Sequence, residues 1–249
     1  MAERDASNEN RSDGNKPKLQ HKYGIINKEY AISLATRAPE EDGPIYMVNL
    51  MKYKEVAEYA NAEGQPAVSG READDQYNPA SILNKIGAAI VFVGDVMSMH
   101  VGTDDWDRVA VVRYPTRRSF VEMQSRKDFS EKHVHKAAGM LRTTIVACRP
   151  VDSSLDRVER PTPRPAHSVA MVIKRTTQRD AAAQQQPVTQ TLLAEGVIIG
   201  DGREWDVVQF LPFTTEEQLE LISKEHQSDD PSDTYVLGLR ATLNSFLSH

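Results

Sequence analysis

The sequence predicts an α+β protein in which one order of elements, β-α-β-β-α-β, occurs twice along the chain. Apolar strands and amphipathic helices alternate in this order from Ile45 onward and again from His167 onward. A short pattern also recurs: Trp-Asp, then an apolar strand, a proline and a threonine, beginning at Trp106 and at Trp205. This split βαβ order is that of ferredoxin-like folds, so we expect two tandem ferredoxin-like repeats.

Length and composition fit two small globular domains. The chain has 249 residues, of which 39% are hydrophobic and 27% are charged, an ordinary globular balance. The formal net charge of −6 argues against a nucleic-acid partner. Residues 1–22 contain almost no apolar side chains, which predicts a disordered polar tail. Because neither a signal sequence nor a membrane span is apparent, we expect a cytoplasmic protein with no membrane contact.

The first domain is expected over residues 23–151. Its central strand is Ile45–Tyr53, which is apolar on both faces and therefore covered on both. The polar segment 54–75 predicts a long loop, and the glycine, proline and capping residues place the other boundaries. The remaining expected elements are a helix at 23–38, a helix from Pro79 with Asn78 as N-cap, strands at 90–101 and 106–114, a helix from Thr116 to Met140, and a strand at 141–151.

The second domain is expected over residues 167–249, after a charged linker with three prolines at 152–166. Pro187 lies within the expected first helix, which should therefore begin late or kink there. The expected elements are a strand at 167–175, a helix at 180–196, strands at 197–200 and 204–212, a helix at 215–224 capped by Thr214, and a strand at 235–243.

Each repeat would leave one face of its sheet without a cover, because both of its helices pack on the other face. A bare apolar sheet face is costly in water. We therefore expect the two sheets to lie face to face within the chain, nearly closing a barrel, with a ligand cavity on the helical side.

Three segments resemble the DUF1330 family of the dimeric α/β-barrel superfamily. They are Tyr46–Tyr53, Val111–Phe120 and Phe129–Gly139, and the resemblance covers about residues 44–151. It implies an intrachain dimeric α/β-barrel whose ligand cavity lies between one sheet and its helices. The superfamily includes cofactor-independent monooxygenases, polyketide cyclases, muconolactone isomerases, haem-degrading oxygenases and stress-related proteins of unknown activity.

The candidate catalytic residues are Asn49, His100 and His135. Asn49 interrupts an apolar strand, where a buried amide could hold a ligand carbonyl or an oxyanion, or could be a structural amide. His100 ends a strand and could be a general base or an exposed histidine without a role. His133 and His135 are two residues apart in a helix, so one faces inward and they cannot share a metal. The resemblance favours His135.

The candidate substrate-binding residues are Arg113, Tyr114, Tyr53 and Tyr77. Adjacent strand residues face opposite sides, so only one of Arg113 and Tyr114 can face a given cavity. Arg113 could bind a carboxylate or form a surface ion pair. Tyr53 and Tyr77 flank the long polar loop and could cover a ligand or pack in the core.

The sequence has no Cys/His metal spacing, no Gly-rich phosphate loop and no Gly-x-Ser-x-Gly motif, so we expect no metal and no tightly bound cofactor. The leading hypothesis is a small-molecule enzyme that transfers a proton on a hydrophobic, oxygenated metabolite. It would be a cyclase, isomerase, lyase or cofactor-independent monooxygenase. Two alternatives stay open: a haem-dependent oxygenase or lyase using His100 or His135 as axial ligand, and a non-catalytic ligand-binding or structural module. A homodimer of the whole chain also stays open.

Overall fold

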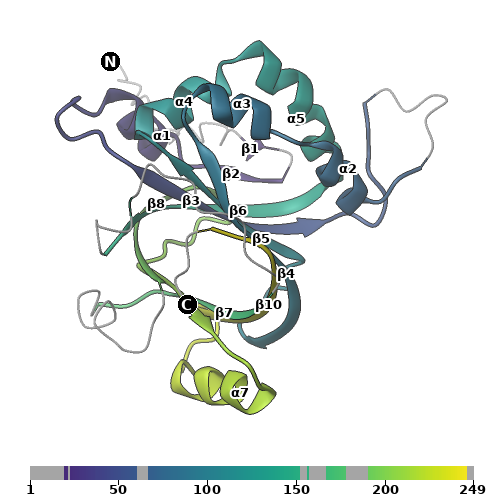
Figure 1. Ribbon diagram of the computed structural model, residues 1–249, viewed down its shortest axis with the longest axis vertical. Helices are drawn as coiled ribbons and strands as arrows, with labels where there is room; N and C mark the ends of the chain where they lie inside the picture. The colour runs from purple at the N-terminus through teal and green to yellow at the C-terminus, as the bar shows by residue number, and fades with distance from the viewer. Residues whose placement is uncertain are drawn as a thin grey trace, which may run out of the picture.

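Eight antiparallel strands close into one barrel in the computed structural model, with helices packed on its outside (Figure 1). The structure describes residues 20–21, 23–60, 67–151, 156, 167–177 and 190–245. The strands are β3 (Ile45–Tyr53), β4 (Ala89–Val101), β5 (Arg108–Tyr114), β6 (Met140–Pro150), β7 (His167–Lys174), β8 (Gln190–Gly200), β9 (Val207–Pro212) and β10 (Thr234–Asn244). Their order is β8-β6-β3-β5-β4-β10-β7-β9, and pairing of β8 with β9 closes the barrel. Two short strands, β1 (Gln20–His21) and β2 (Gly24–Ile26), extend the sheet beside β8.

The predicted fold class, two tandem ferredoxin-like repeats forming an α/β-barrel, is wrong. The strands from the two halves of the chain are not two sheets laid face to face. Backbone hydrogen bonds join β4 to β10 and β6 to β8, so all eight strands belong to a single closed antiparallel barrel. In addition, residues 190–196, expected to end a helix, belong to strand β8. This strand is buried on both faces, and such a short apolar run does not by itself distinguish a strand from a buried helix.

The interior of the barrel is a packed apolar core. Side chains that alternate along each strand point inward and form one cluster that includes Val48, Val111 and Leu237, each with no exposed surface. The rings of Phe92 and Phe210 meet edge to face, with centroids 5.2 Å apart, so the core joins strands from both halves of the chain. Because side chains fill the barrel, a ligand must bind elsewhere.

Among the described residues, five helices cover the outer face of the strands from the first half, and another lies on the opposite side of the barrel (Figure 1). The first group is α1 (Lys28–Thr36), α2 (Gly70–Gln76), α3 (Ala80–Lys85), α4 (Arg117–Gln124) and α5 (Lys127–Gly139), and the other helix is α7 (Glu216–Glu225). Met47 in β3, Leu34 in α1 and Phe129 in α5 belong to a second apolar cluster, which lies between this group of helices and the sheet.

Several expected helix boundaries need correction. The helix expected from Thr116 to Met140 is two helices, α4 and α5, separated at residues 125–126. The helix expected at 23–38 is shorter and follows strand β2, and α2 occupies part of the expected loop at 54–75. Helix α7 is capped by Thr215, whose hydroxyl accepts from the backbone N–H of Gln218, rather than by Thr214.

Three expected segments fall wholly or mostly outside the described residues. They are the polar tail up to residue 19, the linker at 152–166 apart from Asp156, and the part of the expected helix at 180–189. The predictions for the tail and the linker therefore stay predictions. Among the helices that the structure describes, none is long and apolar enough to cross a membrane.

Candidate active site

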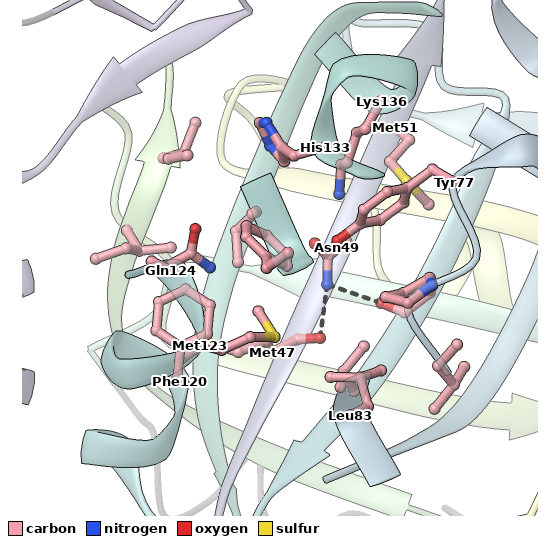
Figure 2. Close-up of a pocket in the computed structure, with 18 of the residues that line it drawn as sticks. Met47, Asn49, Met51, Tyr77, Leu83, Phe120, Met123, Gln124, His133 and Lys136 are labelled. Atoms are coloured by element: carbon pink, nitrogen blue, oxygen red, sulfur yellow. Dashed lines mark hydrogen bonds between the residues drawn. The ribbon is translucent and has the colours of Figure 1, made fainter. Parts of the chain in front are cut away.

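A cavity of about 620 Å³ lies between the outer face of the sheet and the helices. Because successive residues of β3 face opposite sides, Val48 and Leu50 fill the barrel core while Asn49 lines the cavity. The cavity thus lies on the helical side, as the resemblance implied. Its size is in the range of small-molecule sites. The apolar lining includes Met47, Leu83, Phe120 and Met123 (Figure 2). Phe129 and Ile198 also belong to it.

Asn49 presents its carbonyl oxygen, rather than its amide nitrogen, to the cavity. Its Nδ2 donates to the backbone oxygen of Met47 at 2.9 Å and to that of Ala110 at 3.4 Å. Both partners are carbonyl oxygens, which only accept, so they fix which end of the amide points toward them. Oδ1 has no hydrogen-bond partner among the described residues. Asn49 is therefore suited to accept a hydrogen bond from a ligand hydroxyl, and poorly suited to donate to an oxyanion.

Tyr23 and His133 form a hydrogen-bonded pair at the polar end of the cavity. The Tyr23 hydroxyl lies 2.8 Å from Nε2 of His133. The imidazole is packed among aromatic rings, with centroid separations of 5.3 Å to Phe129 and 6.1 Å to Tyr77. Burial raises the pKa of Tyr23, and the charge of Asp74 raises it further. The phenol thus keeps its proton at neutral pH, and the pair can move that proton between oxygen and nitrogen.

Lys136 lies one helical turn beyond His133 and also lines the cavity. Its Nζ is 5.6 Å from the centroid of the Tyr77 ring. Within the described residues, no hydrogen bond or ion pair reaches this nitrogen. Burial lowers the pKa of Lys136, and the charge of Asp74 opposes this only in part. The cavity thus contains an amine without a bonded counterion.

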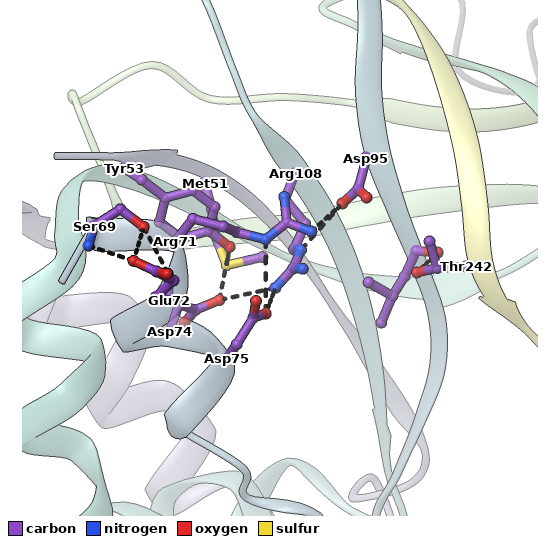
Figure 3. A network of polar contacts seen from close by, with 11 residues as sticks. Met51, Tyr53, Ser69, Arg71, Glu72, Asp74, Asp75, Asp95, Arg108 and Thr242 are labelled. Atoms are coloured by element: carbon purple, nitrogen blue, oxygen red, sulfur yellow. Dashed lines mark hydrogen bonds and ion pairs between the residues drawn. The ribbon is translucent and has the colours of Figure 1, made fainter. Parts of the chain in front are cut away.

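A network of charged groups lies at one edge of the cavity (Figure 3). Arg108 contacts Asp75 at 2.8 Å, Asp95 at 3.2 Å and Asp74 at 3.4 Å. The Tyr53 hydroxyl donates to Asp74 at 2.6 Å. These groups hydrogen-bond and pair with one another. The Tyr53 hydroxyl therefore positions Asp74, and its proton is not available to a ligand. Asp75 is exposed and also lines the cavity, so the cavity reaches solvent at this edge.

Among the predicted site residues, the structure brings Asn49, Tyr77 and Tyr114 together around the cavity. Tyr114 lies on the outer face of β5, where its hydroxyl contacts Sδ of Met123 at 3.5 Å. Arg113, its neighbour, faces away and pairs with Asp156 at 2.5 Å. Of these two residues, Tyr114 is therefore the one in a position to meet a ligand.

The two histidines predicted to be catalytic lie outside the cavity lining. His100 is exposed on β4, where its Nε2 lies 2.8 Å from Oγ of Ser98. Nδ1 of His135 lies 2.9 Å from the hydroxyl of Tyr59. Of the two histidines of α5, His133 lines the cavity and His135 does not.

His133, Lys136 and Tyr23 line the cavity but were not among the site residues predicted from the sequence. A signal for the first two was present, because Phe129, His133 and Lys136 are spaced i, i+4, i+7 and share one helix face. Because Phe129 is a large apolar residue, its position indicates which face of the helix points inward. Tyr23 offered no such signal, because its position depends on the pairing of β2 with β8.

The donor set does not favour a metal or haem. No group of three or more His, Cys, Asp or Glu side chains within the described residues could hold a metal ion. A haem iron needs an axial ligand, and His100 and His135, the residues expected to supply it, do not reach the cavity. His133 does reach it, but its Nε2 is bonded to Tyr23.

No protein-family model matches the chain, and no curated protein matches it, so the resemblance to DUF1330 is unsupported. Three similar solved structures are distant. The RPA0582 protein of unknown function from Rhodopseudomonas palustris is 25% identical with a TM-score of 0.44, covering 52% of this chain and 98% of that chain. An anthrone oxidase-like protein is 10% identical with a TM-score of 0.44, covering 81% and 92%. A candidate monooxygenase from Fusobacterium nucleatum subsp. nucleatum is 9% identical with a TM-score of 0.43, covering 84% and 97%.

Proposed function

We propose that this chain is a small-molecule enzyme that transfers a proton on a hydrophobic, oxygenated substrate bound in the cavity. The observation that carries the proposal is the 2.8 Å hydrogen bond between Tyr23 and His133 at the polar end of a largely apolar cavity. A positioned phenol–imidazole pair is a general acid–base device. An apolar cavity with a few convergent polar groups is the usual form of a substrate site.

The pair can act without forming a free phenolate. The Tyr23 oxygen takes a proton from the substrate while the phenolic proton passes to Nε2 of His133, and the reverse transfer restores the pair. This route agrees with the raised pKa of Tyr23, whose phenol holds its proton at neutral pH. Asn49 Oδ1 accepts a hydrogen bond from a substrate hydroxyl and so orients the substrate between β3 and α5.

The proposal covers a cyclase, an isomerase, a lyase and a cofactor-independent monooxygenase. Each of these reactions can begin with removal of a proton from an activated C–H or O–H group. The apolar lining, rather than a charged receptor, selects the substrate, so we expect fused aromatic or polyketide-like compounds with one or two oxygens.

The direct test is proton exchange on anthrone, a hydrophobic tricyclic ketone with an acidic methylene group. The protein is incubated with anthrone in deuterated buffer without oxygen, and loss of the methylene signal is followed by NMR. We expect His133→Gln and Tyr23→Phe each to slow the exchange by about a hundredfold or more. The control is His135→Gln, which changes the histidine that lies outside the cavity. Oxygen uptake, measured separately, distinguishes a monooxygenase from the other classes.

Two results would contradict the proposal. One is exchange at the wild-type rate in both cavity variants. The other is tight binding of anthrone without any exchange, which would make the chain a ligand-binding module.

A further inference from the structure

We propose that Lys136 forms an imine with an aldehyde or ketone bound in the cavity, which makes carbonyl compounds the substrate class of this site. The inference rests on the proposed function, because it concerns the same cavity and the same proton transfer. It assigns a covalent role to a residue that proton transfer by Tyr23 and His133 does not require.

The first observation is the placement of the amine. Lys136 extends from α5 into the cavity on the same side as His133, toward the strand that carries Asn49 (Figure 2). Tyr77 lies beside both, with its ring centroid 5.6 Å from Nζ of Lys136 and 6.1 Å from the centroid of the His133 ring. A carbonyl group near Nζ would therefore be close to groups that donate and accept protons.

The second observation is the lack of a counterion. Asp74 is the acidic group whose charge acts on Lys136, and its Oδ2 accepts from Tyr53 at 2.6 Å and from Arg108 at 3.4 Å. Asp75 is engaged by Arg108 at 2.8 Å. An ammonium group in an apolar cavity without a bonded partner is costly, and this burial lowers the pKa of Lys136 and shifts it toward the neutral amine.

A neutral lysine amine is a nucleophile toward carbonyl carbon. The Nζ lone pair forms the C–N bond and gives a carbinolamine. A proton supplied to its oxygen lets water leave, and loss of the second N–H proton gives the imine, so the balance is amine plus carbonyl to imine plus water. Protonated again, the C=N group draws electrons from the adjacent carbon. The acidified C–H is the bond from which Tyr23 and His133 then remove a proton.

Lys132 provides a matched control on the same helix. Its Nζ donates to the backbone oxygen of Asn78 at 2.7 Å, and it does not line the cavity. The two lysines lie on the same helix and have the same side chain, but only Lys136 lines the cavity, while the amine of Lys132 is bonded to a backbone carbonyl. A difference in their reactivity therefore reports the cavity environment.

The test is reductive trapping with 1-naphthaldehyde, a hydrophobic aldehyde without an α-hydrogen, so that only imine formation is measured. The full chain is incubated with less than one equivalent of aldehyde and sodium cyanoborohydride, and the adduct is located by peptide mass spectrometry. We expect one secondary-amine adduct, on Lys136. Lys136→Met should lose it and Lys132→Met should keep it. If Lys136→Met does not fold, Lys136→Gln keeps a neutral polar side chain, cannot form the imine and should lose the adduct too.

The inference is overturned if the adduct is spread over the other lysines, or if the Lys136 variants trap as much aldehyde as the wild type. The result is separable from the proposed function. His133→Gln should keep the adduct while losing exchange on anthrone. If the protein traps no aldehyde at Lys136 but its exchange on anthrone still depends on His133, the imine proposal fails and the proposed proton transfer stands.

Discussion

At Asn49, two backbone carbonyls decide which end of the side chain a ligand meets. Both amide hydrogens are directed to Met47 O and Ala110 O, so the free oxygen faces the cavity. The residue type alone did not show this, since an amide offers a donor and an acceptor of nearly equal shape. The sequence identified the position, and the packing of β3 against β5 determined its role.

A carboxylate at this position should be destabilising. In Asn49→Asp, an oxygen replaces the amide nitrogen beside two carbonyl oxygens, and we expect a loss of about 2 kcal/mol of stability at pH 7. These contacts and burial disfavour the charged form and raise the carboxyl pKa in the folded state. The cost should therefore be present above the unfolded pKa and shrink toward pH 4. Urea unfolding of the variant and wild type at both pH values measures this, and equal stability at pH 7 would show that the amide is oriented the other way.

The environment of Lys136 gives a pH dependence of stability with a definite sign. Its pKa in the folded chain is lowered by burial, so between that value and the unfolded value of about 10.4 only the unfolded chain binds the proton. The lysine's contribution to the free energy of unfolding should therefore rise with pH across this window. Relative to Lys136→Met, the wild type should gain stability between pH 7 and pH 10. Parallel stability curves for the two proteins would contradict the buried, unpaired amine.

At the scale of elements, the position of α5 sets the positions of His133 and Lys136 together. The end of this helix touches α2 at two glycines, where a Cβ on Gly139 would lie 2.2 Å from the backbone oxygen of Gly70. The backbone of Lys54 hydrogen-bonds to both glycines: its N–H donates to Gly139 O, and its carbonyl accepts from Gly70 N. The close approach of α2 to α5 therefore fixes the depth at which the cavity residues lie.

A methyl group at this contact should shift the helix. We expect Gly139→Ala to lower stability by about 1–3 kcal/mol, because backbone rather than a flexible side chain must move. Gly43→Ala is the matched control, since nothing lies within 4 Å of a Cβ placed there. Thermal unfolding of both variants measures the difference. A Gly139→Ala protein as stable as the control would mean that the two helices are not held this closely.

Element prediction succeeded where a local pattern was sufficient. The long apolar run at 45–53 and the cap at Thr116 were identified from sequence and are present. It failed at the break between α4 and α5, which resets the helix phase and decides whether His133 or His135 faces the cavity. It failed again at 190–196, where burial on both faces removes the periodicity that separates a strand from a helix.

At the scale of the whole molecule, the barrel depends on strand pairs that join distant parts of the chain. The pairs β4–β10 and β6–β8 connect its two halves, and β8–β9 completes the circle. No local pattern encodes which strand edges meet, so the sequence predicted a covered sheet but not a closed one. The closed barrel keeps the sheet behind the cavity rigid, which fixes Asn49 relative to α5.

Because one core spans both halves, the chain should unfold in a single transition. Trp106 and Trp205 come from different halves, and both pack near Tyr235, with ring centroids 6.3 Å and 5.2 Å from it. In the variants Trp106→Phe and Trp205→Phe, the remaining tryptophan reports one half by fluorescence. Within each variant, urea transitions followed by fluorescence and by circular dichroism should coincide. Transitions that separate would show that the halves are independent domains.

Every role proposed for Asn49, Tyr23, His133 and Lys136 requires that a hydrophobic, oxygenated molecule binds in the cavity between β3 and α5. A crystal structure of the protein with 2-naphthol measures this most directly. We expect fused-ring density between the strand and the helix, with the hydroxyl within hydrogen-bond distance of Asn49 Oδ1. Naphthol bound elsewhere, or absent from this cavity at saturating concentration, would contradict this binding site.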